Sequence, residues 1–284
     1  MKSNARSAAS RTTDIVRVRL GGNPHKQSDV VAAEEPLEIR VRGRSVAVTM
    51  RTPGHDRELT AGFLLTERII SHPKDLKDIA TCRASLSPEN TVDVFLASGI
   101  EVDFARLTRH VFSTSSCGLC GKASIEAVKQ NFPPVNSDLS VAAATIARLP
   151  GRMRAEQQTF AQTGGLHAAA IFDSRGRMIV LREDIGRHNA VDKVVGFGLL
   201  EKKLPFDSHI LLVSGRASFE ILQKALAARF PIVCAVSAPS SLAVEFARES
   251  GQTLVGFLRG YTMNVYAGAE RIVQSAVSRR TRVA

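Results

Sequence analysis

The alternation of apolar and polar positions predicts a small α+β unit in the first third of the chain. Residues 38–42 and 46–50 alternate with period two on either side of a turn at Gly43, which indicates a β-hairpin. Apolar residues at helical spacing predict an amphipathic helix over 57–70. The other elements expected here are strands at 77–83 and 91–98 and a short helix around 103–110.

The second half of the chain alternates strand-like and helix-like segments. This alternation is preceded by two helical patterns, at 124–130 and at 139–160, and the second is broken at Pro150-Gly151. The strands are expected at 168–172, 178–182, 210–213, 232–236 and 253–257, and the helices near 187–202, 216–229, 239–250 and 268–277. Alternation at this pitch predicts a partly parallel sheet layered with helices.

These patterns predict a two-domain protein of the α/β (α+β) class. A chain of 284 residues is long for one core and sufficient for two domains. The expected segments are a flexible N-terminal arm at 1–30, a small α+β domain at 31–113, a cysteine-bearing loop at 114–135 and a larger α/β domain at 136–284.

The charge balance changes the functional picture more than the apolar content does. The chain has 38 Lys and Arg against 27 Asp and Glu, a net charge of +11, which favours anionic ligands such as phosphates and nucleotides. With two Tyr, no Trp and no basic stretch interleaved with aromatics, a dedicated nucleic-acid reader is excluded. No apolar run approaches the roughly 20 residues that span a bilayer, so no membrane association is expected. We expect a cytoplasmic protein, because no secretory signal is visible and four cysteines make no disulfide framework.

Two of the four cysteines, Cys117 and Cys120, lie two residues apart in a Gly- and Ser-rich segment. A structural zinc site needs four ligands, and no second close pair exists. A thioredoxin-type dithiol normally sits between a strand and a helix, whereas this pair lies in a predicted interdomain loop. Accessible thiols in such a loop suit a sulfur carrier, and a purely structural role is the remaining alternative. Cys82 and Cys234 are expected to be buried small hydrophobes.

Several polar turns are candidates for ligand binding. Gly164 and Gly165 permit close backbone approach to a ligand, or equally serve tight packing, and His167 follows them. A zinc deaminase would need His-x-Glu and a later Pro-Cys-x-x-Cys, and both are absent. Residues 182–193 hold eight polar side chains in twelve, with Asp184 a plausible N-cap before Arg187 and His188.

Two further turns follow apolar strands. Ser214-Gly215-Arg216 opens a helix after a strand, which is the arrangement of a phosphate cradle, although it is neither a Walker nor a G-x-G-x-x-G motif. Residues 237–241 repeat the pattern after the next strand. Strand ends are where α/β sheets bind ligands, so both turns are expected at one edge. Residues 256–264 end another strand with a high density of polar groups.

Together these segments resemble the formate dehydrogenase accessory sulfurtransferase family, FdhD. The matching stretches are SSCGLCGKASIE, TGGLHAAAIF, REDIGRHNAVDKVVG, SGRASFEILQKA, VSAPSSLAVEFA and LVGFLRGYTMNVYAG. One departure is Arg68, where the resemblance leads us to expect glycine.

The resemblance implies a fold, a reaction and partners. It implies a cytidine-deaminase-like second domain without intrinsic metal. It also implies that the protein takes sulfur from a cysteine desulfurase as a cysteine persulfide. The sulfur then passes to the molybdenum cofactor, bis-molybdopterin guanine dinucleotide, before insertion into formate dehydrogenase. Cys117 would carry the persulfide, with Cys120 its partner.

The resemblance also assigns residues to cofactor binding. It maps the family's cofactor-binding stretch to Phe257, Leu258, Arg259, Gly260, Tyr261 and Thr262. To these we add the turn residues Gly164, Gly165, His167, Arg187, His188, Ser214, Gly215 and Arg216 as candidates for the cofactor and its guanine nucleotide moiety. A homodimer is expected, because two guanine dinucleotide halves suit a two-fold partner.

Two alternatives stay open at this point. A non-catalytic chaperone would bind the molybdenum cofactor and dock it, with the cysteines only steadying the loop. A dithiol oxidoreductase would need a reversible disulfide between Cys117 and Cys120, so that loss of either cysteine would be equally damaging.

Overall fold

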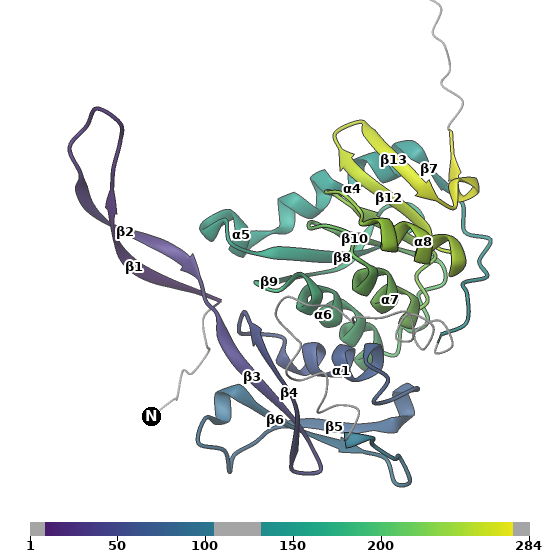
Figure 1. Ribbon diagram of the computed structural model, residues 1–284, viewed down its shortest axis with the longest axis horizontal. Helices are drawn as coiled ribbons and strands as arrows, with labels where there is room; N and C mark the ends of the chain where they lie inside the picture. Colours follow the sequence, from purple (N-terminus) through teal and green to yellow (C-terminus); the bar gives the residue numbers. More distant parts are fainter. Residues whose placement is uncertain (1–8, 105–131, 275–284) are drawn as a thin grey trace, which may run out of the picture.

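The computed structural model describes residues 9–104 and 132–274. Its smaller part is a four-stranded sheet in the order β4-β3-β6-β5, covered on one face by helix α1 (Figure 1). The elements are β3 (Glu35–Val41), β4 (Arg44–Arg51), α1 (Asp56–Thr66), β5 (Leu76–Thr81) and β6 (Thr91–Leu96), with single 3-10 turns at Pro73–Asp75 and Pro88–Asn90. The predicted hairpin, helix and strands of this region are confirmed.

The larger part is built on a six-stranded sheet in the order β13-β12-β11-β10-β8-β9. Strands β10, β11 and β12 run parallel, and β8, β9 and β13 run antiparallel to their neighbours. The strands are β8 (His167–Asp173), β9 (Met178–Asp184), β10 (His209–Val213), β11 (Ile232–Ala235), β12 (Thr253–Arg259) and β13 (Thr262–Ala267). The helices are α4 (Ala143–Glu156), α5 (Gln158–Thr163), α6 (Arg187–Leu200), α7 (Phe219–Ala227) and α8 (Ser241–Glu249).

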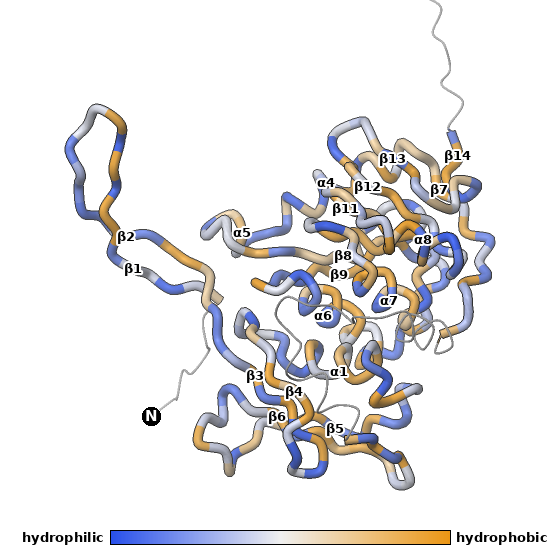
Figure 2. Tube along the Cα trace, viewed as in Figure 1, coloured by the Kyte–Doolittle hydropathy of each residue, from blue (hydrophilic) through white to orange (hydrophobic). Residues whose placement is uncertain are grey.

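Helices cover both faces of this sheet because its strands are apolar on both sides. In the parallel strand β10, Leu211 and Val213 face the core shared with α6, α7 and α8, whereas Ile210 and Leu212 face the second core, formed with α4. Figure 2 shows hydrophobic segments gathered between these helical layers. Full burial on both faces is typical of parallel strands with crossover helices. The mixed α+β class predicted from the sequence is confirmed.

The two parts share one core, because α1 packs directly on α6. The helices cross at Gly62 and Gly196. A Cβ on Gly62 would lie 1.9 Å from the carbonyl oxygen of Asp192, and one on Gly196 would lie 1.8 Å from that of Glu58. Only glycine permits so close an approach of two backbones.

The N-terminal segment differs from the sequence prediction. Residues 10–32 form a hairpin of β1 (Ser10–Arg17) and β2 (His25–Ala32), so the expectation of a loose arm over 1–30 is wrong for this stretch. Gly21-Gly22-Asn23-Pro24 is the turn between two paired strands, with Gly21 at φ 76°.

Three local predictions are also wrong. Helix α4 continues through Pro150, because Ile146, Leu149 and Met153 bury its apolar face against the sheet and outweigh the lost hydrogen bond. In the described part of the helix expected at 268–277, residues 268–274, there is instead a 3-10 turn (Ala269–Arg271) and a short strand, β14 (Ile272–Val273), paired with β7 (Val141–Ala142). Asp184 ends β9, and Gly186 is the N-cap residue of α6.

Arg68, the departure from the expected glycine, has a left-handed backbone with φ 57°. Its guanidinium lies over the ring of Phe132, 5.1 Å from the centroid. A non-glycine residue is strained at this φ, and a cation–π contact offsets strain of that size. The helices predicted at 103–110, beyond residue 104, and at 124–130 lie outside the described residues. In the described part of the chain no helix is long and apolar enough to cross a membrane.

Candidate functional site

One edge of the six-stranded sheet collects most of the polar turns found in the sequence. The carboxyl ends of β10, β11 and β12 lie there, together with the start of β8 and the end of β9, since His167 pairs with Asp184. The turns that meet at this edge are 163–167, 184–188, 214–218, 236–241 and 257–262. The predicted placement of the two cradle-like turns at one edge is confirmed.

Those two turns are hydrogen-bonded to each other. The Ala217 N–H donates to the Ala238 carbonyl at 3.2 Å, and the Ser240 N–H donates to the Ala217 carbonyl at 3.0 Å. Ser240 then caps α8, its Oγ accepting from the Ala243 N–H at 3.2 Å. Helices α7 and α8 therefore begin side by side at the same edge. Their N-terminal N–H groups give this edge a preference for anions.

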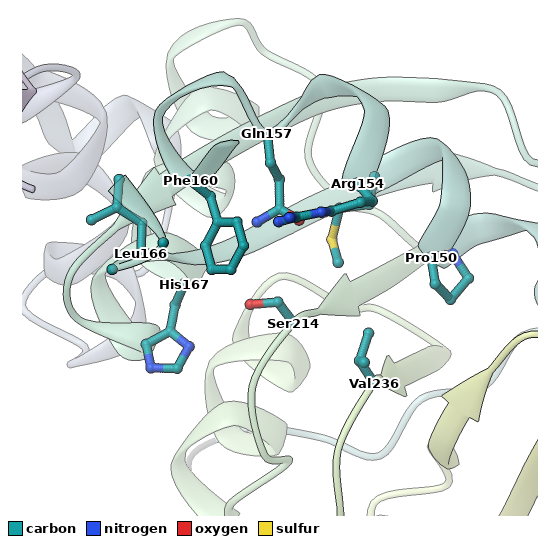
Figure 3. Close-up of a pocket in the computed structure, with 11 residues that line it drawn as sticks. Pro150, Arg154, Gln157, Phe160, Leu166, His167, Ser214 and Val236 are labelled. Atoms are coloured by element: carbon teal, nitrogen blue, oxygen red, sulfur yellow. The ribbon is translucent and has the colours of Figure 1, made fainter. Parts of the chain in front are cut away.

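A pocket of about 680 Å³ opens at this edge on the side of α4 and α5 (Figure 3). Figure 3 shows Arg154, Gln157 and Phe160 on one wall, with Ser214 and Val236 on the opposite wall. The pocket is lined by Pro150, Met153, Arg154, Gln157, Phe160, Gly164, Gly165, Leu166, His167, Ser214 and Val236. The Arg154 guanidinium lies 4.1 Å from the centroid of the Phe160 ring. This wall combines apolar surface, an aromatic face and a cation.

Ser214 follows β10 and is hydrogen-bonded to the start of β8, where His167 lies. The Ser214 Oγ accepts from the Ala168 N–H at 2.9 Å, and the Ser214 N–H donates to the Ala168 carbonyl at 2.9 Å. A Cβ on Gly215 would lie 3.3 Å from His167 Nδ1, so glycine leaves room for the imidazole. Burial, then the charge of Arg187, lowers the pKa of His167, against an opposing effect of Asp184. The ring is therefore neutral at neutral pH.

Arg187 is the first residue of α6 and lies beside this turn, its Cβ 3.7 Å from the position of a Gly215 Cβ. Its Nε is buried and has no hydrogen-bond partner among the described residues. The end of β9 fixes the helix start, because Asp184 Oδ1 accepts from the Gly186 N–H at 2.8 Å and from Asn189 at 3.0 Å. A buried guanidinium N–H without an acceptor is costly, which points to an anionic ligand at this position.

His188 has a different environment from its neighbour. Its Nε2 lies 3.5 Å from the Ser218 Oγ and 4.0 Å from the Glu220 carboxylate, in the contact between α6 and α7. Burial, reinforced by the charges of Lys224 and Arg187, lowers the pKa of His188 to about 4. A neutral imidazole among side chains of its own fold fits a structural role better than anion binding.

The turn between β12 and β13 lies at the same edge. The Phe257 N–H donates to the Ser237 carbonyl at 3.1 Å, and Arg259 Nε donates to the carbonyl of Val236, a pocket residue, at 3.1 Å. Tyr261 is 96% exposed, whereas Leu258 is fully buried in the core. The remaining predicted residues, Arg216, Gly260 and Thr262, are exposed. The structure thus offers Phe257, Arg259 and Tyr261 to a ligand, but not the Leu258 side chain.

The two cysteines on which the chemistry was predicted, Cys117 and Cys120, lie outside the described residues. Cys82 and Cys234 are buried, and burial raises the pKa of the Cys234 thiol, so their predicted role as small hydrophobes is confirmed. Across residues 9–104 and 132–274, His, Cys, Asp and Glu side chains form no group of three or more that could hold a metal ion.

Sequence reasoning missed the helical wall of the pocket. Met153, Arg154, Gln157 and Phe160 come from α4 and α5, and their sequence has no motif or turn signal. Their pattern predicts only an amphipathic helix. The pocket exists because α5 turns back over the edge where β8 begins, which is a tertiary arrangement.

Comparison with known proteins finds close relatives over most of the chain. A sulfur carrier protein FdhD of Streptomyces coelicolor is 50% identical over 273 residues, covering 92% of this chain and 95% of its own length. The Mycobacterium tuberculosis protein of the same name is 52% identical over 253 residues, covering 86% of this chain and 92% of its own length. The Saccharolobus solfataricus protein of the same name is 43% identical over 262 residues, covering 91% of this chain and 96% of its own length.

A solved structure supports the same relationship. A Desulfotalea psychrophila protein, provisionally named a formate dehydrogenase accessory protein, is similar with a TM-score of 0.76 and 27% identity, covering 94% of this chain and 100% of its own. The sequence model of the FdhD/NarQ family matches residues 32–273, which include every turn of the sheet edge described above. The chain therefore belongs to the FdhD/NarQ family.

Proposed function

We propose that this protein is a cytoplasmic sulfur carrier for formate dehydrogenase maturation. In this proposal it accepts sulfur from a cysteine desulfurase as a persulfide on Cys117. It then passes the sulfur to bis-molybdopterin guanine dinucleotide before that cofactor enters formate dehydrogenase. The names of relatives at about 50% identity support the carrier role. The observation that supports cofactor binding is the buried Arg187 Nε beside a pocket and two helix N-termini.

The sheet edge fits the chemistry of this cargo. The cofactor carries purine rings and pyrophosphates, and these need an apolar or aromatic wall and a concentration of donors. Phe160 and Met153 supply the aromatic and apolar wall. Arg187 and the starts of α7 and α8 supply the hydrogen-bond donors. Two dinucleotide halves also suit a homodimer, which light scattering would test.

Sulfur loading of this protein is a thiol exchange. The Cys117 thiolate attacks the terminal sulfur of the donor persulfide, and a new S–S bond forms on Cys117. The S–S bond of the donor breaks, and the donor cysteine leaves as a thiolate. No net oxidation occurs, so this step needs no further co-reactant.

Intact-protein mass spectrometry after incubation with a cysteine desulfurase and cysteine tests the carrier role. We expect a gain of one or more sulfur atoms that reduction removes and that Cys117→Ala abolishes, with Cys82→Ala as the matched control that keeps it. No gain in the wild type, with activation of formate dehydrogenase intact in Cys117→Ala, would favour the cofactor-binding chaperone. Equal damage from Cys120→Ala and a reversible disulfide would favour the dithiol oxidoreductase.

Calorimetry with GDP tests the binding site separately. We expect GDP to bind and Arg187→Ala to weaken it about 10-fold or more, since a charge-assisted hydrogen bond contributes roughly 1.5–3 kcal/mol. Lys74→Ala, an exposed cation on the small domain, is the control and should leave the affinity unchanged. Unchanged affinity in Arg187→Ala would contradict the assigned position of the phosphates.

A further inference from the structure

The β1–β2 hairpin is a two-stranded sheet that projects from the body of the molecule (Figure 1). Its register runs through eight antiparallel pairs, from Ser10↔Ala32 to Arg17↔His25. Neither strand pairs with another described strand, so both edges of the ribbon are open. A hairpin of two strands is only marginally stable by itself in water, and open edges invite a partner.

The tip of this hairpin combines exposed apolar and basic side chains. Val16, Val18 and Leu20 are exposed to 57%, 67% and 105%. Arg17 and Arg19 alternate with them and are also exposed, as is Lys26, which pairs across the ladder with Val16. Figure 2 shows this alternation of hydrophobic and hydrophilic residues along the hairpin. Adjacent exposed apolar side chains rimmed by charge are typical of a protein-binding surface.

The root of the hairpin is packed against the wall of the pocket. The Cβ of Ala32 lies 3.4 Å from where a Cβ on Gly165 would be, and Gly165 lines the pocket. Strand β2 also contacts α5, which carries Phe160. Arg11 is bonded to Glu35, which in turn pairs with the buried Arg51 at 3.3 Å. The hairpin is thus anchored at its base and rises beside the mouth of the ligand site.

The model of the FdhD/NarQ family does not include the hairpin. The match to the FdhD/NarQ family begins at residue 32, where β2 ends. Nearly all of the hairpin lies outside the segment matched by the family model, whereas the turns of the sheet edge lie inside it.

We propose that the β1–β2 hairpin is a docking arm for an acidic protein surface on the molecule that receives the ligand of the sheet edge. This inference rests on the proposed function, because it assumes that the bound cofactor is handed on. Arg17, Arg19 and Lys26 are exposed cations at the tip and favour a partner with an acidic surface. Val18 and Leu20 would supply the apolar contact, and the root would hold the partner beside the pocket.

The test compares tip variants of the full-length protein in binding to purified formate dehydrogenase that lacks its molybdenum cofactor. Arg17→Glu/Arg19→Glu should raise the Kd about 10-fold or more at low salt, and the difference should shrink as salt is added. Val18→Ser/Leu20→Ser should raise the Kd to a similar extent at every salt concentration, because its effect is not electrostatic. Lys74→Glu/Lys77→Glu makes the same charge change on the small domain and should stay within about 2-fold of wild type.

Three results would overturn the docking proposal. The first is an equal Kd for both tip variants and the lysine control. The second is a tip-dependent change of molecular mass in light scattering without any change in enzyme binding, which would assign the arm to a second copy. The third is tip-dependent binding to vesicles containing anionic phospholipid, again without a change in enzyme binding. The side chains changed are exposed, so unfolding temperatures near wild type should confirm that the variants are folded.

GDP binding and sulfur loading of the same variants separate this proposal from the proposed function. Tip variants that bind GDP and load sulfur normally but also bind the enzyme normally would refute the docking arm alone. A wild-type protein that neither loads sulfur nor binds GDP, yet binds the enzyme through the tip, would refute the proposed function and leave the docking surface.

Discussion

The middle and the start of helix α6 differ in how buried charge is satisfied. In the middle, Asp192 meets Lys224 at 2.9 Å and Thr66 at 2.8 Å, and Lys193 meets Asp184 at 2.7 Å. At the start, the Nε of Arg187 is buried without a partner among the described residues. The paired charges connect the two parts of the molecule, whereas Arg187 lies beside Gly215, the neighbour of the pocket residue Ser214. Buried charge with full pairing is therefore structural here, and buried charge without it indicates a ligand.

The pairing in the middle of α6 is reflected in the pKa values. Burial raises the pKa of Asp192 to about 6 against the opposing charge of Lys224. Lys224 is itself desolvated, but the charges of Asp192 and Glu67 outweigh this and raise its pKa. Both groups are charged at neutral pH, and each depends on the other.

Breaking this buried pair should have the largest effect on stability. Asp192→Ala leaves Lys224 buried with only Glu67 and Thr66, and we expect a loss of roughly 3–5 kcal/mol in the free energy of unfolding. Urea denaturation measures it. Replacing both partners, Asp192→Leu/Lys224→Met, should recover much of the loss, because no charge then remains buried alone. A double variant as unstable as the single one would contradict the pairing argument.

Disturbing the crossing of α1 and α6 should have the second largest effect on stability. Gly196→Ala places a Cβ 1.8 Å from the Glu58 carbonyl oxygen, so α1 must move away, at a cost of about 3 kcal/mol. Gly151→Ala is the matched control in α4, where a Cβ meets nothing within 4 Å, and it should be neutral or stabilise the helix by up to about 1 kcal/mol. The unfolding temperature should therefore fall in Gly196→Ala and stay the same or rise in Gly151→Ala. Similar shifts would show that the crossing is not tight.

The ion pair of Glu58 with Arg182 should have a smaller effect that depends on pH. Burial opposes ionisation of Glu58, but the bonds from Arg182, at 2.5 and 2.8 Å, and from His55 outweigh it and lower its pKa to about 2. A folded pKa below the unfolded value of 4.5 gives stability that is present above pH 4.5 and lost as the pH falls toward 2.

Glu58→Gln should therefore cost roughly 2 kcal/mol at pH 7, and its difference from wild type should shrink below pH 4.5. Asp78→Asn is the control, because the Asp78–Arg57 pair is exposed on both sides. Urea titrations at pH 7 and pH 3 measure both variants. A difference that stays constant over this range would exclude an ionised Glu58 as the cause.

The smallest effect on stability is expected at the start of α6. Arg187→Ala removes a guanidinium whose Nε bonds to no described group, so the free energy of unfolding should change by less than about 0.5 kcal/mol or even rise. The same variant should bind GDP about 10-fold or more weakly. A large loss of stability with unchanged GDP affinity would reverse the comparison between the two regions of α6.

Much of the fold could be predicted from local patterns. The periodicity of β3, β4 and α1 and the apolar strands of the larger sheet follow from alternating burial, which the order of residues already contains. The position of the polar turns at strand ends likewise indicated one ligand-binding edge, because parallel strands bring their carboxyl ends together. Family membership was equally visible in motifs such as SGRASFE and GFLRGYT.

Tertiary structure decided what each polar residue does. Arg187 and His188 are neighbours in one motif, but Arg187 has a buried Nε without a hydrogen-bond partner among the described residues, whereas His188 lies against Ser218 and Glu220. Leu258 lies within a predicted binding stretch, but strand alternation buries it in the core. The pocket wall from Arg154 and Phe160 has no sequence signal, since it depends on how α5 folds back over β8. Local order sets the elements, whereas burial and charge pairing arise between segments far apart in the chain.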